Sequence, residues 1–75
     1  MTALPGHKQS RRLVEHEAYR RIMTGQAPEM LSQLAQEILG WFRETHAGAP
    51  AMTLNEVEDY IREIWRRRHE FIRGG

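Results

Sequence analysis

Residues 30–42 read MLSQLAQEILGWF, and the apolar residues of this stretch recur at helical spacing. At about 100° per residue, its apolar side chains fall on one helical face and most of its polar side chains fall on the other. The apolar face covers close to half of the circumference, which is wider than contact with a single neighbour requires. We therefore predict a central helix that packs against two neighbours, either two other helices or one helix and a partner subunit.

Breaks rich in glycine, alanine and proline flank this helix, with GQAP at 25–28 and AGAPA at 47–51. Glycine suits the position after a helix, and proline suits the first turn of the next. A segment of helical length lies beyond each break, and no strand-like alternation occurs. The sequence predicts an all-α fold, a compact three-helix bundle with short loops and antiparallel neighbours. Its helices are expected at roughly residues 10–24, 28–46 and 54–73.

The chain has 75 residues, so a single domain is the only option. We expect a three-helix domain over residues 8–73, with flexible tails at 1–7 and 74–75. A domain this small buries only about 60% of the surface that its unfolded chain exposes. Because the chain has no cysteine, no disulfide can stabilise it. Tight helix packing or a partner chain must compensate, and we expect self-association.

The third predicted helix has the clearest start. Thr53 and Glu56 match the T-x-x-E capping box, and Met52 and Val57 are spaced as the hydrophobic staple across it. The first predicted helix has the weakest start. Ser10 could cap it, but two arginines would then lie in its first turn and oppose the helix dipole. Either this helix begins elsewhere, or those charges serve something other than local stability.

Two charged residues fall on apolar faces. Arg68 lies in the apolar stripe of the third helix, and Glu15 lies in that of the first. A charge on a core face is rarely buried unless it is paired. Glu15 and Arg68 could form a buried ion pair if the first and third helices pack antiparallel or cross at these positions. Alternatively, Arg68 snorkels to water along its aliphatic stem and Glu15 lies at a rim.

The sequence contains no motif for catalysis, a metal or a cofactor, so we expect a protein that is not an enzyme. No two of the four histidines (His7, His16, His46 and His69) lie on one helix at the spacing that zinc ligands need. No G-x-S-x-G elbow or phosphate-binding glycine loop occurs. No run reaches the roughly 18 apolar residues of a membrane span. Without cysteine or an export signal, we expect a cytoplasmic location.

Partner binding is the leading functional prediction. Trp41 and Trp65 lie at the edges of their apolar faces, and tryptophan, tyrosine and arginine dominate interface hot spots. We predict that Trp41, Trp65, Tyr60 and Phe71 bind a partner protein or a second copy; the alternative is that they only fill the core. The sequence thus favours a small helical interaction or regulatory protein that self-associates.

Arginine clusters suggest a second class, although the net charge is only +1. The candidate residues for nucleic-acid binding are Arg11, Arg12, Arg20, Arg21, Arg66 and Arg67. Glutamates are interleaved with them at helical spacing, as in Glu17 with Arg21. The clusters therefore form either a salt-bridged face in contact with solvent or the phosphate-binding surface of a small nucleic-acid-binding regulator.

Overall fold

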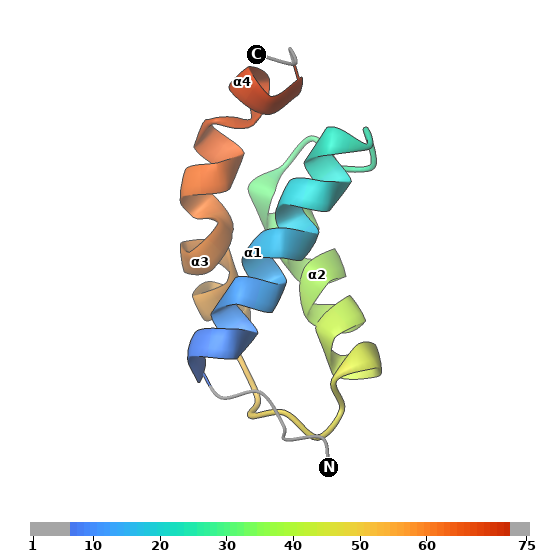
Figure 1. Ribbon diagram of the computed structural model, residues 1–75, viewed down its shortest axis with the longest axis vertical. Coiled ribbons are helices and arrows are strands. Elements are labelled where there is room, and N and C mark those ends of the chain that lie inside the picture. Colours follow the sequence, from blue (N-terminus) through green and yellow to red (C-terminus); the bar gives the residue numbers. More distant parts are fainter. Residues whose placement is uncertain (1–6, 73–75) are drawn as a thin grey trace.

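A computed structural model of the chain describes residues 7–72 as four helices. They are α1 (His7–Met23), α2 (Leu31–Thr45), α3 (Leu54–Arg66) and the short α4 (Arg68–Ile72). Figure 1 shows α1 and α3 running in one direction and α2 in the opposite direction. Each long helix contacts both others, and α4 contacts α1 and α3. The predicted all-α three-helix bundle is confirmed, with a short fourth helix added; the predicted tails lie outside the described residues, except that His7 already belongs to α1.

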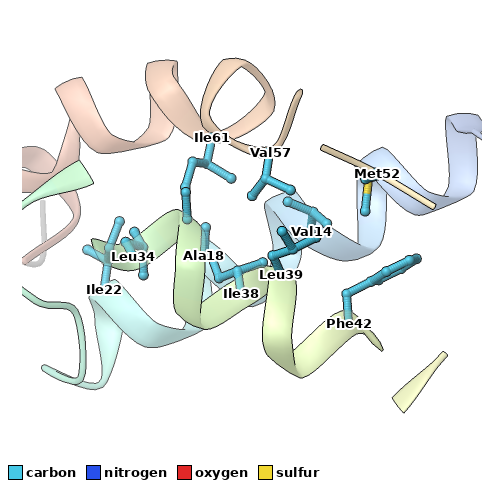
Figure 2. Close-up of a cluster of buried hydrophobic side chains, with 11 residues drawn as sticks. Val14, Ala18, Ile22, Leu34, Ile38, Leu39, Phe42, Met52, Val57 and Ile61 are labelled. Atoms are coloured by element: carbon cyan, nitrogen blue, oxygen red, sulfur yellow. The ribbon is translucent and has the colours of Figure 1, made fainter. Parts of the chain in front are cut away.

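The core is built from small and medium apolar side chains of all three long helices. α2 contributes the largest share, and Figure 2 shows the side chains meeting between the helices. The buried apolar residues are Val14, Ala18, Ile22, Leu34, Ala35, Ile38, Leu39, Phe42, Met52, Val57 and Ile61. Most of the larger aromatic side chains pack against this core without being buried in it. No helix in the described range is long and apolar enough to cross a membrane.

The predicted glycine break ends α1. Gly25 has a φ of 75°, in the left-handed region that glycine adopts without strain. Its amide donates to the Ile22 carbonyl at 3.2 Å, and the Gln26 amide donates to the Arg21 carbonyl at 2.8 Å. These two bonds form a Schellman motif, which satisfies carbonyls at the helix end and turns the chain back toward α2.

The predicted capping box starts α3. The Glu56 amide donates to Thr53 Oγ1 at 3.1 Å, and the Thr53 amide donates to Glu56 Oε1 at 2.9 Å. Met52 and Val57 are both buried beside this cap, as the predicted staple requires. Both capping predictions are therefore confirmed.

The starts of α1 and α2 differ from the predicted boundaries. Because α1 begins at His7, Ser10 is not its cap but a buried residue within it. The arginines that follow Ser10 then lie in the second turn, where the dipole field is weaker, so the predicted conflict is removed. α2 begins only at Leu31, because Met30 is extended with φ −116° and ψ 140°, which leaves Pro28 outside the helix.

The third predicted helix is interrupted at Arg67, where φ is −100° and ψ is 13°. The Arg67 amide still donates to the Glu63 carbonyl at 3.2 Å, and α4 then begins at Arg68. An uninterrupted helix would direct Arg68 into the apolar stripe, where an unpaired charge is costly. After the break, Arg68 lies on the ring of Trp65 and Phe71 packs against Tyr19 of α1. The predicted end at Arg73 lies outside the described residues.

Candidate interaction surface

Exposed apolar side chains gather at the end of the bundle where α1 ends and α2 begins. Tyr19 is 42% exposed, Met23 is 48% exposed and Met30 is 59% exposed. Phe71 of α4 packs edge-on against Tyr19, with 4.9 Å between the ring centroids. Because α1 and α2 are antiparallel, Met23 and Met30 both lie at this end of the molecule (Figure 1). We call Tyr19, Met23, Met30 and Phe71 the apolar end.

Arg68 and Trp65 form a second feature, at the junction of α3 and α4. The guanidinium of Arg68 lies 4.1 Å from the centroid of the Trp65 ring, and its Nη1 donates to the Trp65 carbonyl at 2.8 Å. Both side chains are half-buried. A guanidinium on an indole face gains cation–π stabilisation, which increases as the pair is desolvated. The pair leaves a cation at the edge of apolar surface.

The four residues predicted to bind a partner are all half-buried but are not brought together. Phe71 of α4 belongs to the apolar end, and Trp65 lies close to it, in the last turn of α3. Trp41 lies in the last turn of α2, at the opposite end, edge-on to the His46 ring at 5.6 Å. Tyr60 lies in the middle of α3, beneath the guanidinium of Arg11 at 5.3 Å. No single surface of the described residues therefore unites all four.

The predicted ion pair between Glu15 and Arg68 is wrong. Glu15 instead accepts from Arg11 Nε at 3.2 Å, and Arg68 is held by Trp65. Each charge instead has a partner close to it in sequence: Glu15 has Arg11 one helical turn earlier, and Arg68 has Trp65 three residues earlier.

Glu17 is a buried carboxylate at the interface of α1 and α2. Its side chain is 6% exposed and accepts from Arg20 Nε at 3.0 Å, from Arg20 Nη2 at 2.8 Å and from Arg21 Nε at 2.7 Å. Arg21 also reaches Glu37 of α2, at 3.3 Å. The hydrogen bonds from Arg20, and after them those from Arg21, hold the pKa of Glu17 at about 2, although desolvation raises it. The cluster thus stays ionised and links α1 to α2.

The glutamates neutralise most of the arginines proposed for nucleic-acid binding. Within residues 7–72, Arg12 is the one of the six without a carboxylate within ion-pair distance. The other five pair as Arg11 with Glu15, Arg20 and Arg21 with Glu17, Arg66 with Glu63 and Arg67 with Glu70. Exposed pairs of this kind are weak individually, but they place an anion beside each cation and so reduce the local positive field.

The loop between α2 and α3 encloses a small hollow of about 120 Å³ at the other end of the bundle. Its apolar floor includes Leu39, Phe42 and Met52, with Arg43 and His46 beside it. His46 stacks on Phe42 at 5.0 Å, and its Nδ1 lies 2.8 Å from Thr45 Oγ1, so the ring has a structural role. In the described part of the chain, no three histidine, aspartate or glutamate side chains cluster as metal ligands would.

Sequence reasoning missed that Glu17 is buried and that Tyr19 and Met23 are exposed. Helical spacing predicts an apolar stripe of Val14, Ala18, Tyr19, Ile22 and Met23, whereas the buried face includes Ser10 and Glu17 and leaves Tyr19 and Met23 exposed. A signal was present, because Glu17 lies three residues after Val14 and is followed by arginines at i+3 and i+4. That spacing allows two arginines to neutralise one carboxylate on a helix.

Comparison of the chain with protein-family models, with curated proteins and with solved structures finds no match. The functional argument therefore depends on the geometry of the chain itself.

Proposed function

We propose that this chain is a small, non-enzymatic helical protein that acts by binding protein, including a second copy of itself, in a structural or regulatory role. The observation that carries the proposal is the apolar end. Exposed apolar side chains that form a contiguous patch mark interaction sites, and the proposal takes Tyr19, Met23, Met30 and Phe71, at one end of the bundle, as such a patch. Methionine and aromatic residues are also enriched where proteins meet. The cysteine-free composition favours a cytoplasmic location.

The chemistry of the described residues supports a binding role over a catalytic one. The carboxylate with the strongest shift, Glu17, has a pKa of about 2 and is held ionised by two arginines. Such a group is a poor general base near neutral pH, because an efficient base has a pKa close to the working pH.

Sedimentation equilibrium tests the proposal. Between about 5 and 500 µM, the weight-average mass of the wild-type chain is expected to rise with concentration. A Met23→Gln, Met30→Gln double variant is expected to stay monomeric, because both side chains are exposed and their loss leaves the core intact. Ala51→Gln, an exposed change at the opposite end, serves as the control and is expected to behave as wild type.

A wild-type chain that is monomeric throughout this range would refute self-association. Nucleic-acid binding has less support, because most of the candidate arginines are already paired with glutamate. Retention of the chain on DNA or RNA at about 50 mM salt, with a steep loss as salt is added, would favour that alternative instead.

A further inference from the structure

The junction of α3 and α4 leaves one flank of the bundle without a covering element. α4 packs against α1 and α3, through contacts such as Phe71 on Tyr19, and within residues 7–72 it makes no contact with α2. The first turn of α2 lies at this same end (Figure 1). Its residue Leu31 and the α3 residue Trp65 are both only half-buried. The short helix therefore covers the α1 side of this end and leaves the α2 side open.

Arg68 differs from the neighbouring arginines because it has no carboxylate partner among residues 7–72. The nearby arginines of α3 and of the break each have a carboxylate: Arg62 pairs with Asp59, Arg66 with Glu63 and Arg67 with Glu70. Arg68 has none among residues 7–72, although it is half-buried and they are exposed. Its one hydrogen bond in the described part of the chain goes to the neutral carbonyl of Trp65.

A half-buried arginine such as Arg68, with no carboxylate partner among residues 7–72, is unusual beside apolar side chains. Arginine presents five N–H donors in a planar fork that matches a carboxylate with two parallel hydrogen bonds. Here the ring of Trp65 holds the fork at 4.1 Å, which fixes its orientation before any partner arrives. A carboxylate that docked beside Trp65 would meet a cation that is already oriented, so less entropy would be lost on binding.

We infer that the surface formed by Trp65, Arg68 and the start of α2 receives a segment of another protein that presents a carboxylate beside apolar side chains, such as an acidic amphipathic helix. The inference rests on the proposed function and names the partner chemistry. Charge complementarity favours this occupant over a second copy of the chain. In a two-fold dimer, the same surface on both copies would bring two Arg68 cations toward each other.

The test is an NMR titration of the ¹⁵N-labelled full chain with a synthetic peptide of about 18 residues, long enough to form a helix. The peptide carries leucines along one face and glutamates beside them, and matched peptides replace every glutamate by glutamine or by lysine. The indole N–H of Trp65 is expected to shift with the glutamate peptide. The indole of Trp41, at the opposite end of the bundle, is the internal reference and is expected to stay in place.

A pair of variants gives the decisive comparison. Arg68→Gln is expected to weaken binding of the glutamate peptide about ten-fold or more, since a hydrogen-bonded charge pair is lost. Arg66→Gln, with a side chain 72% exposed and only a 3.7 Å contact to Glu63, is expected to bind as wild type. Equal binding of the three peptides, equal weakening by both variants, or no shift of Trp65 at millimolar peptide would overturn the inference.

Sedimentation of the same samples keeps the two proposals separate. If the chain self-associates but ignores the acidic peptide, the inference fails and the proposed function stands. If the chain is monomeric yet binds the peptide through Arg68, the docking surface stands and self-association falls.

Discussion

Glu17 illustrates how a charged residue can belong to the interior of so small a domain. Burying a lone carboxylate is costly, and its desolvation raises its pKa. Arg20 and Arg21, one helical turn away, offset this cost because they donate hydrogen bonds of 2.7–3.0 Å to the Glu17 carboxylate. The pKa of Glu17 is therefore lowered to about 2. Through Arg21 the same charges reach Glu37, so a pattern local to α1 also positions α2.

Removing the charge of Glu17 should destabilise the fold. Glu17→Gln keeps the shape of the side chain but leaves two arginines beside a neutral acceptor, and we expect a loss of about 1–2 kcal/mol in the free energy of unfolding. Glu15→Gln removes a more exposed pair and should cost less than about 0.5 kcal/mol. Urea denaturation followed by circular dichroism measures both. Equal losses would contradict the role assigned to Glu17.

The lowered pKa of Glu17 predicts that the stability of the fold depends on pH. Its pKa is lower in the folded chain, about 2, than its ordinary value of 4.5, so the folded state binds the proton less tightly. Its contribution to stability is therefore present above about pH 4.5 and is lost as the pH falls toward 2. The stability difference between wild type and Glu17→Gln should be largest near neutral pH and shrink steadily below about pH 4.5. A difference that stays constant down to about pH 3 would contradict it.

At the scale of the element, the start of α3 depends on a single hydroxyl. Thr53→Ala removes the acceptor of the Glu56 amide and should cost about 1 kcal/mol. Thr53→Ser keeps that oxygen and should leave stability within about 0.5 kcal/mol of wild type. Thermal unfolding of the two variants measures the difference, and the capping account fails if serine is as damaging as alanine.

Alanine substitutions at two glycines should change the free energy of unfolding in opposite directions. Gly25 has a positive φ, so Gly25→Ala forces a side chain into the left-handed region and should cost about 1–2 kcal/mol. Gly40 lies exposed within α2, and a Cβ built there meets no atom within 4 Å. Gly40→Ala should therefore stabilise the chain by up to about 1 kcal/mol. Urea denaturation measures both variants, and a shift in the same direction for the two would refute this account.

Some features of these helices can be predicted from the sequence and others cannot. The three helices, the capping box and the glycine break are predictable because their signals are local. The break at Arg67 has no proline or glycine beside it, so no local signal predicts it. Which side chains of α1 are buried depends on how the helices pack against one another, which the periodicity of α1 alone does not contain.

The sequence predicts which types of residue form the candidate site, but not where in the bundle they lie. The positions of Trp41 and Trp65 at the edges of their apolar stripes indicate that a side chain there can be half covered, and the structure leaves both half-buried, as it does Tyr60 and Phe71. Their distribution over two ends of the bundle depends on the directions of the helices. Arg68 likewise lies on the indole ring of Trp65 and does not pair with Glu15, which accepts from Arg11.

At the scale of the whole molecule, stability and association are linked. The fully buried core is small, and large apolar side chains such as Tyr19, Met23 and Met30 remain in contact with water. A domain of this size has only about 4–11 kcal/mol of stability, so covering that surface would change it measurably. If the chain self-associates as proposed, association adds to the stability of the folded state as concentration rises.

The melting temperature should consequently depend on concentration. For a dimer, a roughly 100-fold increase that begins near the dissociation constant adds about 1 kcal/mol per chain, which raises Tm by about 6 °C in a domain of this size. Differential scanning calorimetry of the wild-type chain measures this shift. The Met23→Gln, Met30→Gln variant should melt at one temperature throughout, because it removes the apolar end without touching the core. If wild type and variant both show a constant Tm, the folded unit is a monomer over this range and the proposed self-association is refuted.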